Sequence, residues 1–238
     1  KIGYATTTEL GDSQNLVNNA VETAQFGMTA RFELPSLTAY PRVEAYDPDV
    51  ESVSLEEMIE LGEKLITTVR SHTPDILCEA EATKGVVSVR IINSRGGQAN
   101  YRKSIFSLAI EGTIFRDTDM LFVGESESSC HPLLETRTIA EAVLQQLELA
   151  KNRASAPSQL LPIVFTPNGA ASALILPLMA AFNGKTVLEG ASPVGNRLSQ
   201  SVFDEKLWLW DDPTVAYRPG SRPWDDEGIP SQRTPLIE

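Results

Sequence analysis

The chain has 238 residues, of which 42% are apolar and 22% are charged, and its formal net charge is −12. This length and composition suffice for at least one complete hydrophobic core and exclude a disordered chain. The acidic balance argues against a nucleic-acid-binding protein, because phosphate backbones are bound by clustered Lys and Arg. No apolar run reaches the roughly 20 residues of a membrane-spanning helix. Residues 1–4 do not open like a secretory signal, so we expect a cytoplasmic location without membrane association.

The first 50 residues predict a helix between two extended segments. Residues 1–8 are expected to form a short strand, and Asp12 or Ser13 to cap the helix that follows. Prolines at positions 35, 41 and 48 predict an extended crossing over residues 31–49. The apolar residues of the helix recur at helical spacing and are Leu16, Val17, Ala20, Val21 and Ala24.

A capping box begins the second predicted helix. In Ser54-Leu55-Glu56-Glu57 the Ser54 hydroxyl can accept the amide of Glu57, while the Glu57 carboxylate returns to the amide of Ser54. Thr73-Pro74 ends this helix. We expect an inward-facing stripe of Leu55, Met58, Ile59, Gly62, Leu65, Ile66 and Val69.

After Pro74 the pattern changes to alternating residues that predict an antiparallel meander with one face packed by helices. A helix over residues 134–151 follows it. The expected strands are 76–82, 86–93, 104–111 and 120–126, with turns at Lys84-Gly85 and at 94–97.

Small and polar residues over 153–159 mark a linker. The fold class predicted is α+β: an N-terminal domain over 1–153 with a helix-packed antiparallel meander, then the incomplete start of a second, mostly β domain over 160–238. In that second region we expect strands at 163–165, 186–188 and 207–210 around an apolar helix. Trp208 and Trp210 are expected to lie mostly in the core.

Two cysteines and two histidines are the residues most able to carry metal or nucleophilic chemistry. Cys78 and Cys130 form no Cys-x-x-Cys pattern, and His72 is remote in sequence from Cys130-His131. Neighbouring side chains usually point apart, so Cys130-His131 is a poor chelating pair, although a nucleophile pair there stays open.

Several short motifs occur in a fixed order along the chain. They are Gly3-Tyr4-Ala5-Thr6, Thr166-Pro167, Gly190-Ala191-Ser192, Asp211-Asp212-Pro213 and the run from Gly220 to Pro230. In this order they resemble the TldD/PmbA family, bacterial and archaeal proteins described as peptide-processing metalloproteases and, historically, as modulators of DNA gyrase. Against that pattern the chain looks truncated at both ends.

The resemblance has one gap. In the catalytic branch of the family a His-Glu-x-x-x-His zinc motif falls at Ile175, Leu176 and Ala180, all three apolar here. Aliphatic side chains offer zinc no lone pair. The chain therefore resembles the zinc-free PmbA/TldE branch, which implies no catalytic residue, no metal ligand and no cofactor in this chain, with zinc held by a TldD-type partner.

The resemblance implies a non-catalytic subunit of a TldD/TldE-type metalloprotease that processes short or unfolded peptides, as a homo- or hetero-dimer. By itself such a chain would be inactive. Two alternatives stay open: a stand-alone metal-dependent hydrolase and a non-enzymatic protein-binding regulator, such as a gyrase modulator.

The turn Trp224-Asp225-Asp226-Glu227-Gly228 supplies the candidate contact residues. Its carboxylates could hold a cation or act in acid-base chemistry, which is what the hydrolase alternative needs. We favour a structural or subunit-contact role, with positive-φ glycines at 220 and 228 and acidic side chains that accept backbone amides or pair with Arg222 and Arg233. Trp224 is either a peptide or subunit contact or part of the core.

Overall fold

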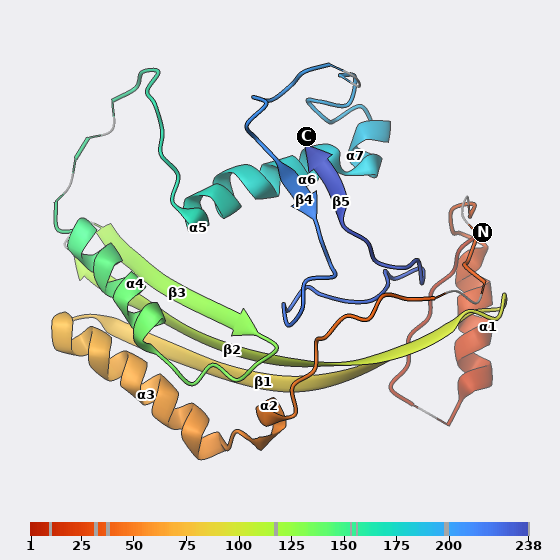
Figure 1. Ribbon diagram of the computed structural model, residues 1–238, viewed down its shortest axis with the longest axis horizontal. Helices are drawn as coiled ribbons and strands as arrows, with labels where there is room; N and C mark the ends of the chain where they lie inside the picture. Colours follow the sequence, from red (N-terminus) through yellow and green to blue (C-terminus); the bar gives the residue numbers. More distant parts are fainter. Residues whose placement is uncertain are drawn as a thin grey trace.

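The computed structural model describes residues 1–9, 11–30, 33–36, 39–116, 119–152, 154–155, 157–197 and 200–237. Within them a long curved sheet lies below a lobe of short helices and strands (Figure 1). The elements are α1 (Ser13–Ala24), α2 (Asp49–Ser52), α3 (Leu55–His72), β1 (Leu77–Ile92), β2 (Gln98–Arg116), β3 (Asp119–Ser129), α4 (Arg137–Leu149), α5 (Pro167–Ala170), the π-helix η1 (Ala171–Ile175), α6 (Leu176–Phe182), α7 (Gly184–Leu188), β4 (Leu209–Asp211) and β5 (Thr234–Ile237).

The sheet is an antiparallel meander in the order β1-β2-β3. The turn predicted at Lys84-Gly85 is wrong, because β1 runs through both residues, opposite Phe106 and Ile105 of β2. Both common two-residue hairpin turns need positive φ at the first central position, which Lys disfavours. The turn predicted at 94–97 is confirmed: Gly96 has φ 83° and the Asn93 N–H donates to the Gly97 carbonyl at 2.9 Å.

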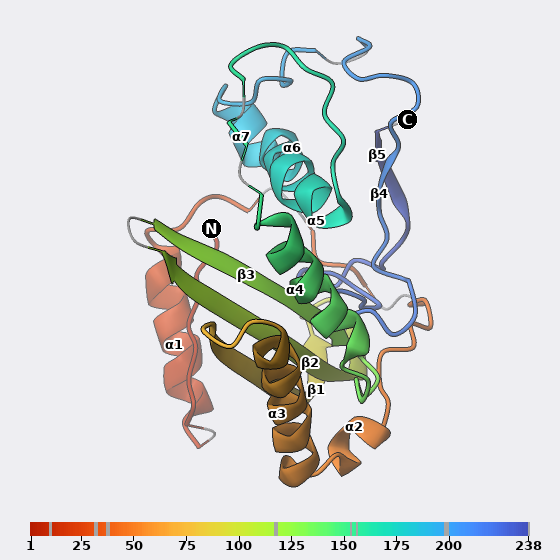
Figure 2. The same ribbon diagram turned by 90° about the vertical axis from the view of Figure 1, so that its left-hand side faces the viewer.

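The core lies between the convex face of the sheet and the helices α3 and α4, which run beside each other over that face (Figure 2). Alternate residues of β2 point into it, so Phe106, Leu108 and Ile110 are fully buried. The buried stripe of α3 is Met58, Leu61, Leu65 and Val69.

Leu55 and Ile59 do not face inward as predicted, being 66% and 51% exposed. Helix α3 packs against α4 as well as against the sheet. Its buried face is therefore rotated relative to the prediction, so that Leu61 is buried and Leu55 and Ile59 are not. The capping box that begins this helix is confirmed, with Ser54 and Glu57 bonded in both directions.

At the N-terminus the predicted strand over residues 1–8 is wrong, because the described part of that segment is assigned no strand. The segment is instead held by the Ile2 N–H, which donates to the Met28 carbonyl at 2.9 Å, and by the Tyr4 carbonyl, which accepts the Thr23 hydroxyl at 3.0 Å. Helix α1 forms as predicted, with the Asp12 carboxylate accepting the Asn15 N–H at 3.1 Å, and it buries no residue.

In the upper lobe the strands predicted at 163–165 and 186–188 are wrong. Residues 163–165 have no pairing strand, and 186–188 belong to α7, whose start is fixed by the Asn183 side chain accepting the N–H groups of Lys185 and Thr186. Strand β4 (Leu209–Asp211) overlaps the predicted 207–210 at two residues and pairs with β5. The α+β class is confirmed, while the domain boundary at 153–159 stays a prediction. Among the described helices, none combines the length and apolar character needed to cross a membrane.

Candidate functional site

A continuous helical segment from α5 through η1 to α6 stands over the concave face of the sheet (Figure 1). It begins at Thr166, whose hydroxyl accepts the Gly169 N–H at 3.1 Å, and Pro167 occupies the first turn, where no N–H is required. The segment connects to β3 through Asn168, whose side-chain amide donates to the Glu125 carboxylate at 3.0 Å.

The middle of this segment is a π-helix, in which the Leu176 N–H donates to the Ala171 carbonyl five residues back. Pro177 follows immediately, and a proline inside a helix removes one N–H and crowds the carbonyl four residues earlier. The wider π turn relieves that crowding without ending the helix. It also sets which side chains of the segment face the sheet.

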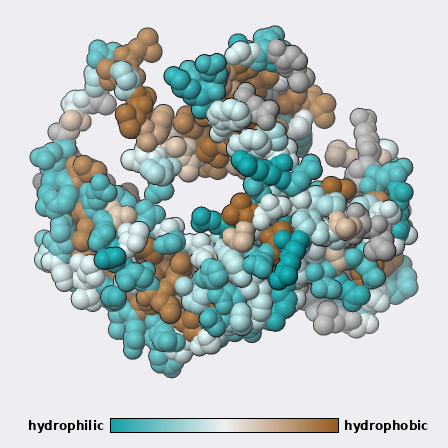
Figure 3. Space-filling view, in the orientation of Figure 1, coloured by the Kyte–Doolittle hydropathy of each residue, from teal (hydrophilic) through white to brown (hydrophobic). Residues whose placement is uncertain are grey.

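The helical segment and the sheet enclose a groove with a cavity volume of about 780 Å³. Figure 3 shows it as an opening between the lobe and the sheet. One wall consists of β2 and β3 around Glu111 and Gly124, and the other carries Asn168, Ser172, Ile175 and Leu176. Its size lies within the range of ligand-binding clefts.

Two of the three positions at which the resemblance places the zinc motif, Ile175 and Leu176, line this groove, and Ala180 does not. None of the three side chains carries a nitrogen, oxygen or sulfur donor, so zinc does not fit at these positions. Among the described residues there is also no group of three or more His, Cys, Asp or Glu side chains that could hold a metal ion.

The strand register determines which side chains of the sheet face the groove. Because Phe106, Leu108 and Ile110 face the core, their neighbours Ala109, Glu111 and Thr113 face the groove side. Glu79 of β1 stands directly opposite Glu111, and both side chains are exposed. The adjoining row consists of Leu77, Thr113 and Phe122. Sequence reasoning missed this arrangement, since pairing partners could not be assigned while β1 was divided by a turn.

The turn that contains the candidate contact residues packs on the far end of the β1–β2 hairpin. Trp224 is 4% exposed, and its ring lies 5.1 Å from that of Tyr40 and 4.8 Å from that of Tyr101. The Asp225 carboxylate accepts the N–H groups of Glu227 and Ile229, at 3.1 and 2.8 Å.

The other acidic residues of the turn are exposed. Asp226 pairs with Arg222 at 2.7 Å, whereas Arg233 lies 3.9 Å from Asp212 and not from the turn. Gly228 has φ 84° and its carbonyl accepts the Tyr40 hydroxyl at 3.1 Å, but Gly220 has no positive φ.

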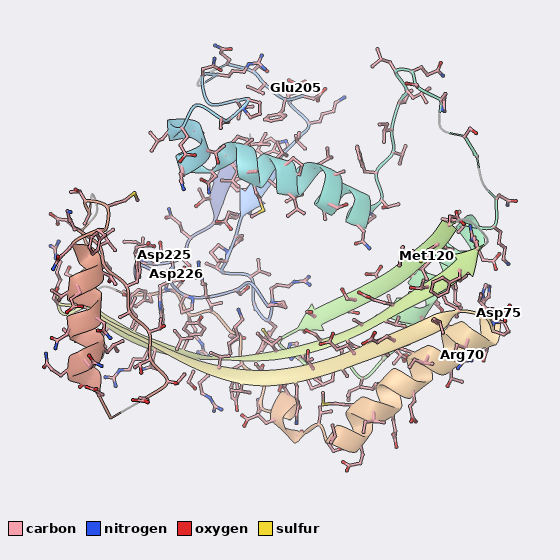
Figure 4. The ribbon with its side chains drawn as sticks, turned by 180° about the vertical axis from the view of Figure 1, so that it is seen from behind. Arg70, Asp75, Met120, Glu205, Asp225 and Asp226 are labelled. Carbon is pink, nitrogen blue, oxygen red and sulfur yellow. The ribbon has the colours of Figure 1, made fainter. Side chains whose placement is uncertain are left out.

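Asp225 and Asp226 lie at the opposite end of the sheet from Met120 (Figure 4). The structure therefore does not bring the acidic turn to the groove. A subunit contact at Trp224 to Gly228 stays a prediction, and the exposed Asp226 and Glu227 are the members of the turn that a partner could reach.

A second polar cluster ties the segment 213–222 to the N-terminal half. His131 Nδ1 lies 2.6 Å from the Asp47 carboxylate, and its ring stacks on Tyr217 at 4.0 Å. Tyr217 has φ 55°, and its N–H donates to the Glu44 carbonyl at 2.6 Å. The hydrogen bond with His131, and next that with the Asp49 N–H, hold the pKa of Asp47 below its ordinary value.

Cys130 is fully buried beside this cluster, and burial raises the pKa of its thiol. A raised pKa keeps the sulfur protonated, which is unsuited to a nucleophile. The neighbouring Lys103 donates to the Ser221 carbonyl at 2.9 Å, and burial lowers its pKa. Cys130-His131 is thus part of a structural junction, with His131 turned to Asp47 and not to the thiol.

Comparisons with known proteins agree with this architecture. Residues 158–238 match the family described as the PmbA/TldA metallopeptidase C-terminal domain. An uncharacterised protein of Methanocaldococcus jannaschii is 27% identical over 242 residues, which cover 100% of this chain and 55% of the relative.

Two solved structures share the fold. TldE from Thermococcus kodakarensis has a TM-score of 0.81 at 20% identity, covering 99% of this chain and 55% of that one. A candidate modulator of DNA gyrase from Bacteroides thetaiotaomicron also has a TM-score of 0.81 at 20% identity, covering 98% and 55%. The chain thus spans about half the length of the proteins it matches. The matched C-terminal domain over residues 158–238 supports the resemblance of this chain to the TldD/PmbA family, and the solved structures show that it shares their fold.

Proposed function

We propose that this chain is a zinc-free, PmbA/TldE-like subunit that holds short or unfolded peptides in the groove under α5–α6. It acts in the cytoplasm with a zinc-bearing TldD-type partner, which supplies the hydrolytic centre. The observation that carries the proposal is the groove itself: Ile175 and Leu176 line it where the catalytic branch places zinc-binding residues, so the cleft is present while the donors are not.

A partner is supported by apolar side chains that the lobe leaves in solvent. Leu176 and Met179 on α6 are 63% and 59% exposed, and Leu188 at the end of α7 is 89% exposed. Contiguous exposed apolar surface marks protein interaction sites more often than single scattered residues do. The Trp224 to Gly228 turn offers a second contact surface at the other end of the sheet.

A bound peptide is expected to lie against the side chains of the concave face. Strand addition along the outer edge of β3 is hindered, because the side-chain amide of Gln146 occupies both backbone groups of Gly124. The Ser126 N–H is likewise taken by the Glu125 carboxylate at 3.0 Å. The groove therefore offers a more accessible site than that edge.

The test is a peptide-cleavage assay on the purified chain, on a TldD-type protein from the same host, and on their mixture, each with and without a zinc chelator. We expect no chelator-sensitive cleavage by this chain and cleavage by the mixture. Chelator-sensitive cleavage by this chain by itself would refute the assignment and favour the stand-alone hydrolase.

A matched pair of variants locates the peptide. Ser172→Trp places a bulky ring in the groove, whereas Ala173→Trp adds the same ring one residue along the helix, at a position that does not line the groove. Peptide binding to the chain should fall with the first variant and persist with the second. Equal binding by both variants would place the peptide elsewhere.

The name of the Bacteroides thetaiotaomicron structure favours a second candidate function, a regulator that binds another protein without turnover. It predicts a stable complex, with a topoisomerase as one target to examine, and no peptide cleavage in any mixture. Co-purification from the native host followed by the cleavage assay separates the two functions.

A further inference from the structure

The concave face of the sheet has a charge arrangement that the proposed subunit role leaves unexplained. Glu79 and Glu111 are direct cross-strand partners on the same face, and both are exposed. Directly opposed side chains have Cβ atoms only about 5 Å apart, and like charges there destabilise a sheet. Glu81, opposite Ala109 in the next row on that face, adds a third carboxylate.

No basic side chain in the described residues neutralises this pair. Neither Glu79 nor Glu111 takes part in a salt bridge within them. On the same face of β2 the next basic residue toward the hairpin is Lys103, which donates to the Ser221 carbonyl. It lies eight residues along the strand from Glu111, about 27 Å at 3.4 Å per residue.

Glu111 belongs to the groove wall. Its partner in the neighbouring strand β3 is Gly124, which has no side chain. A Cβ atom added to Gly124 would lie 3.5 Å from Glu111 Cγ. The Glu111 side chain therefore extends over the space that a larger residue at 124 would fill. Both residues line the groove below Ser172 and Ile175. Glu111 thus places negative charge on the sheet wall of the groove, and Glu79 stands beside it on the neighbouring strand β1.

The surroundings of the pair are apolar. In the row next to it, Leu77 and Phe122 are 64% and 68% exposed, and the opposite wall carries Ile175 and Leu176. A divalent metal ion would need more donors than this pair offers, and the described residues contain no group of three or more that could hold one. An ammonium or guanidinium group on a partly apolar chain complements the site in charge and in character.

We infer that the groove selects peptides with a Lys or Arg side chain flanked by apolar residues, and that Glu79 and Glu111 bind that cation. This inference rests on the proposed function for the peptide and the groove and adds the class of substrate. The like-charge repulsion in the empty sheet is relieved when the cation lies between the two carboxylates.

The experiment measures binding of three labelled peptides to the full chain by fluorescence anisotropy. The peptides share apolar flanks and differ at the central residue, which is Lys, the uncharged isostere norleucine, or Glu. We expect the Lys peptide to bind at least about tenfold more tightly than the Glu peptide, with a preference that weakens as salt is added.

The variant Glu79→Gln/Glu111→Gln should abolish the preference while the norleucine peptide binds as before. The control is Glu56→Gln/Glu60→Gln, which removes the same charge from the exposed side of α3, beyond the other face of the sheet, and should keep the preference. Equal binding of the three peptides to the wild-type chain, or a preference unchanged in Glu79→Gln/Glu111→Gln, overturns the inference and leaves the proposed function intact. Absence of binding by every peptide contradicts both.

Discussion

The side-chain amide of Gln146 on α4 makes two hydrogen bonds with the backbone of Gly124 on β3, accepting its N–H at 3.1 Å and donating to its carbonyl at 2.9 Å. These backbone groups point away from β2, toward the open edge of the sheet. The Gln146 side chain thus makes the two backbone hydrogen bonds that a neighbouring strand would make at Gly124. It prevents another chain from pairing with β3 at that point.

Replacing Gln146 by Ala should lower the free energy of unfolding by about 1 to 2 kcal/mol, because two partly buried backbone groups lose their partner. Urea denaturation monitored by circular dichroism measures the loss. The control is Gln145→Ala, at the exposed position next to it on α4. A loss of the same size in both variants would show that helix propensity, and not the edge contact, is being measured.

Glu79→Gln should stabilise the free protein by a few tenths of a kcal/mol, since it removes the repulsion from Glu111 across the strand pair. Added salt should narrow the difference between wild type and variant, because salt screens the repulsion. Thermal unfolding at low and high ionic strength gives both results. Glu60→Gln on α3 serves as the control, and an equal gain there would contradict the cross-strand explanation.

Asp47→Asn tests the junction with His131 through its pH dependence. Because the folded state lowers the pKa of Asp47, this carboxylate stabilises the fold above its unfolded pKa, about 4, and that contribution is lost as the pH falls through the folded pKa. We expect the variant to lose about 1 kcal/mol near neutral pH and to converge with wild type in acid.

Urea unfolding over a series of pH values measures that convergence, with the exposed Asp75→Asn as control. A difference between wild type and Asp47→Asn that grows below about pH 4 would contradict the sign of this linkage.

Trp224→Ala should cost about 3 kcal/mol or more, because the ring is 4% exposed and fills the space between Tyr40 and Tyr101. Trp208 is the matched control. It is 58% exposed, contrary to its expected place in the core, so its truncation should cost at most about 1 kcal/mol. Guanidinium denaturation of both variants compares them. Equal losses would mean that the turn is not anchored through Trp224.

Gly228→Ala should destabilise by about 1 to 2 kcal/mol, since φ 84° is unfavourable for a residue with a Cβ atom. The added Cβ would also lie 3.0 Å from Ile91 Cδ1. Gly85→Ala provides the control, because a Cβ there meets no atom within 4 Å and φ is not positive. A stabilised Gly228→Ala protein would contradict the observed turn conformation.

Local signals in the sequence predicted the helices of the N-terminal half well. Ser54 and Glu57 begin α3 and Asp12 begins α1, because a cap depends on residues three positions apart and on nothing distant. The strands were less predictable. Gly85 suggested a turn, yet β1 continues because its partner β2 is long enough to pair with all of it.

The groove could not be found from local patterns, because its walls come from distant parts of the chain. Glu111 and Ile175 line one cleft, and Glu79 stands opposite Glu111, only once the register of the sheet and the position of α5 are known. The Asp47–His131 contact joins residues 84 positions apart. The motif comparison named Ile175 and Leu176 only as positions where the catalytic branch has its zinc motif; that both line the groove is seen from the structure.

Among the residues that the structure describes, one side-chain hydrogen bond, from Asn168 to Glu125, ties the α5–α6 segment to the sheet beneath it. Because this contact is a hydrogen bond and not interlocked side chains, the α5–α6 segment can move relative to the sheet without disturbing the core between α3, α4 and the sheet. We therefore expect the distance between α5–α6 and Glu111 to vary more than the spacing between α3, α4 and the sheet.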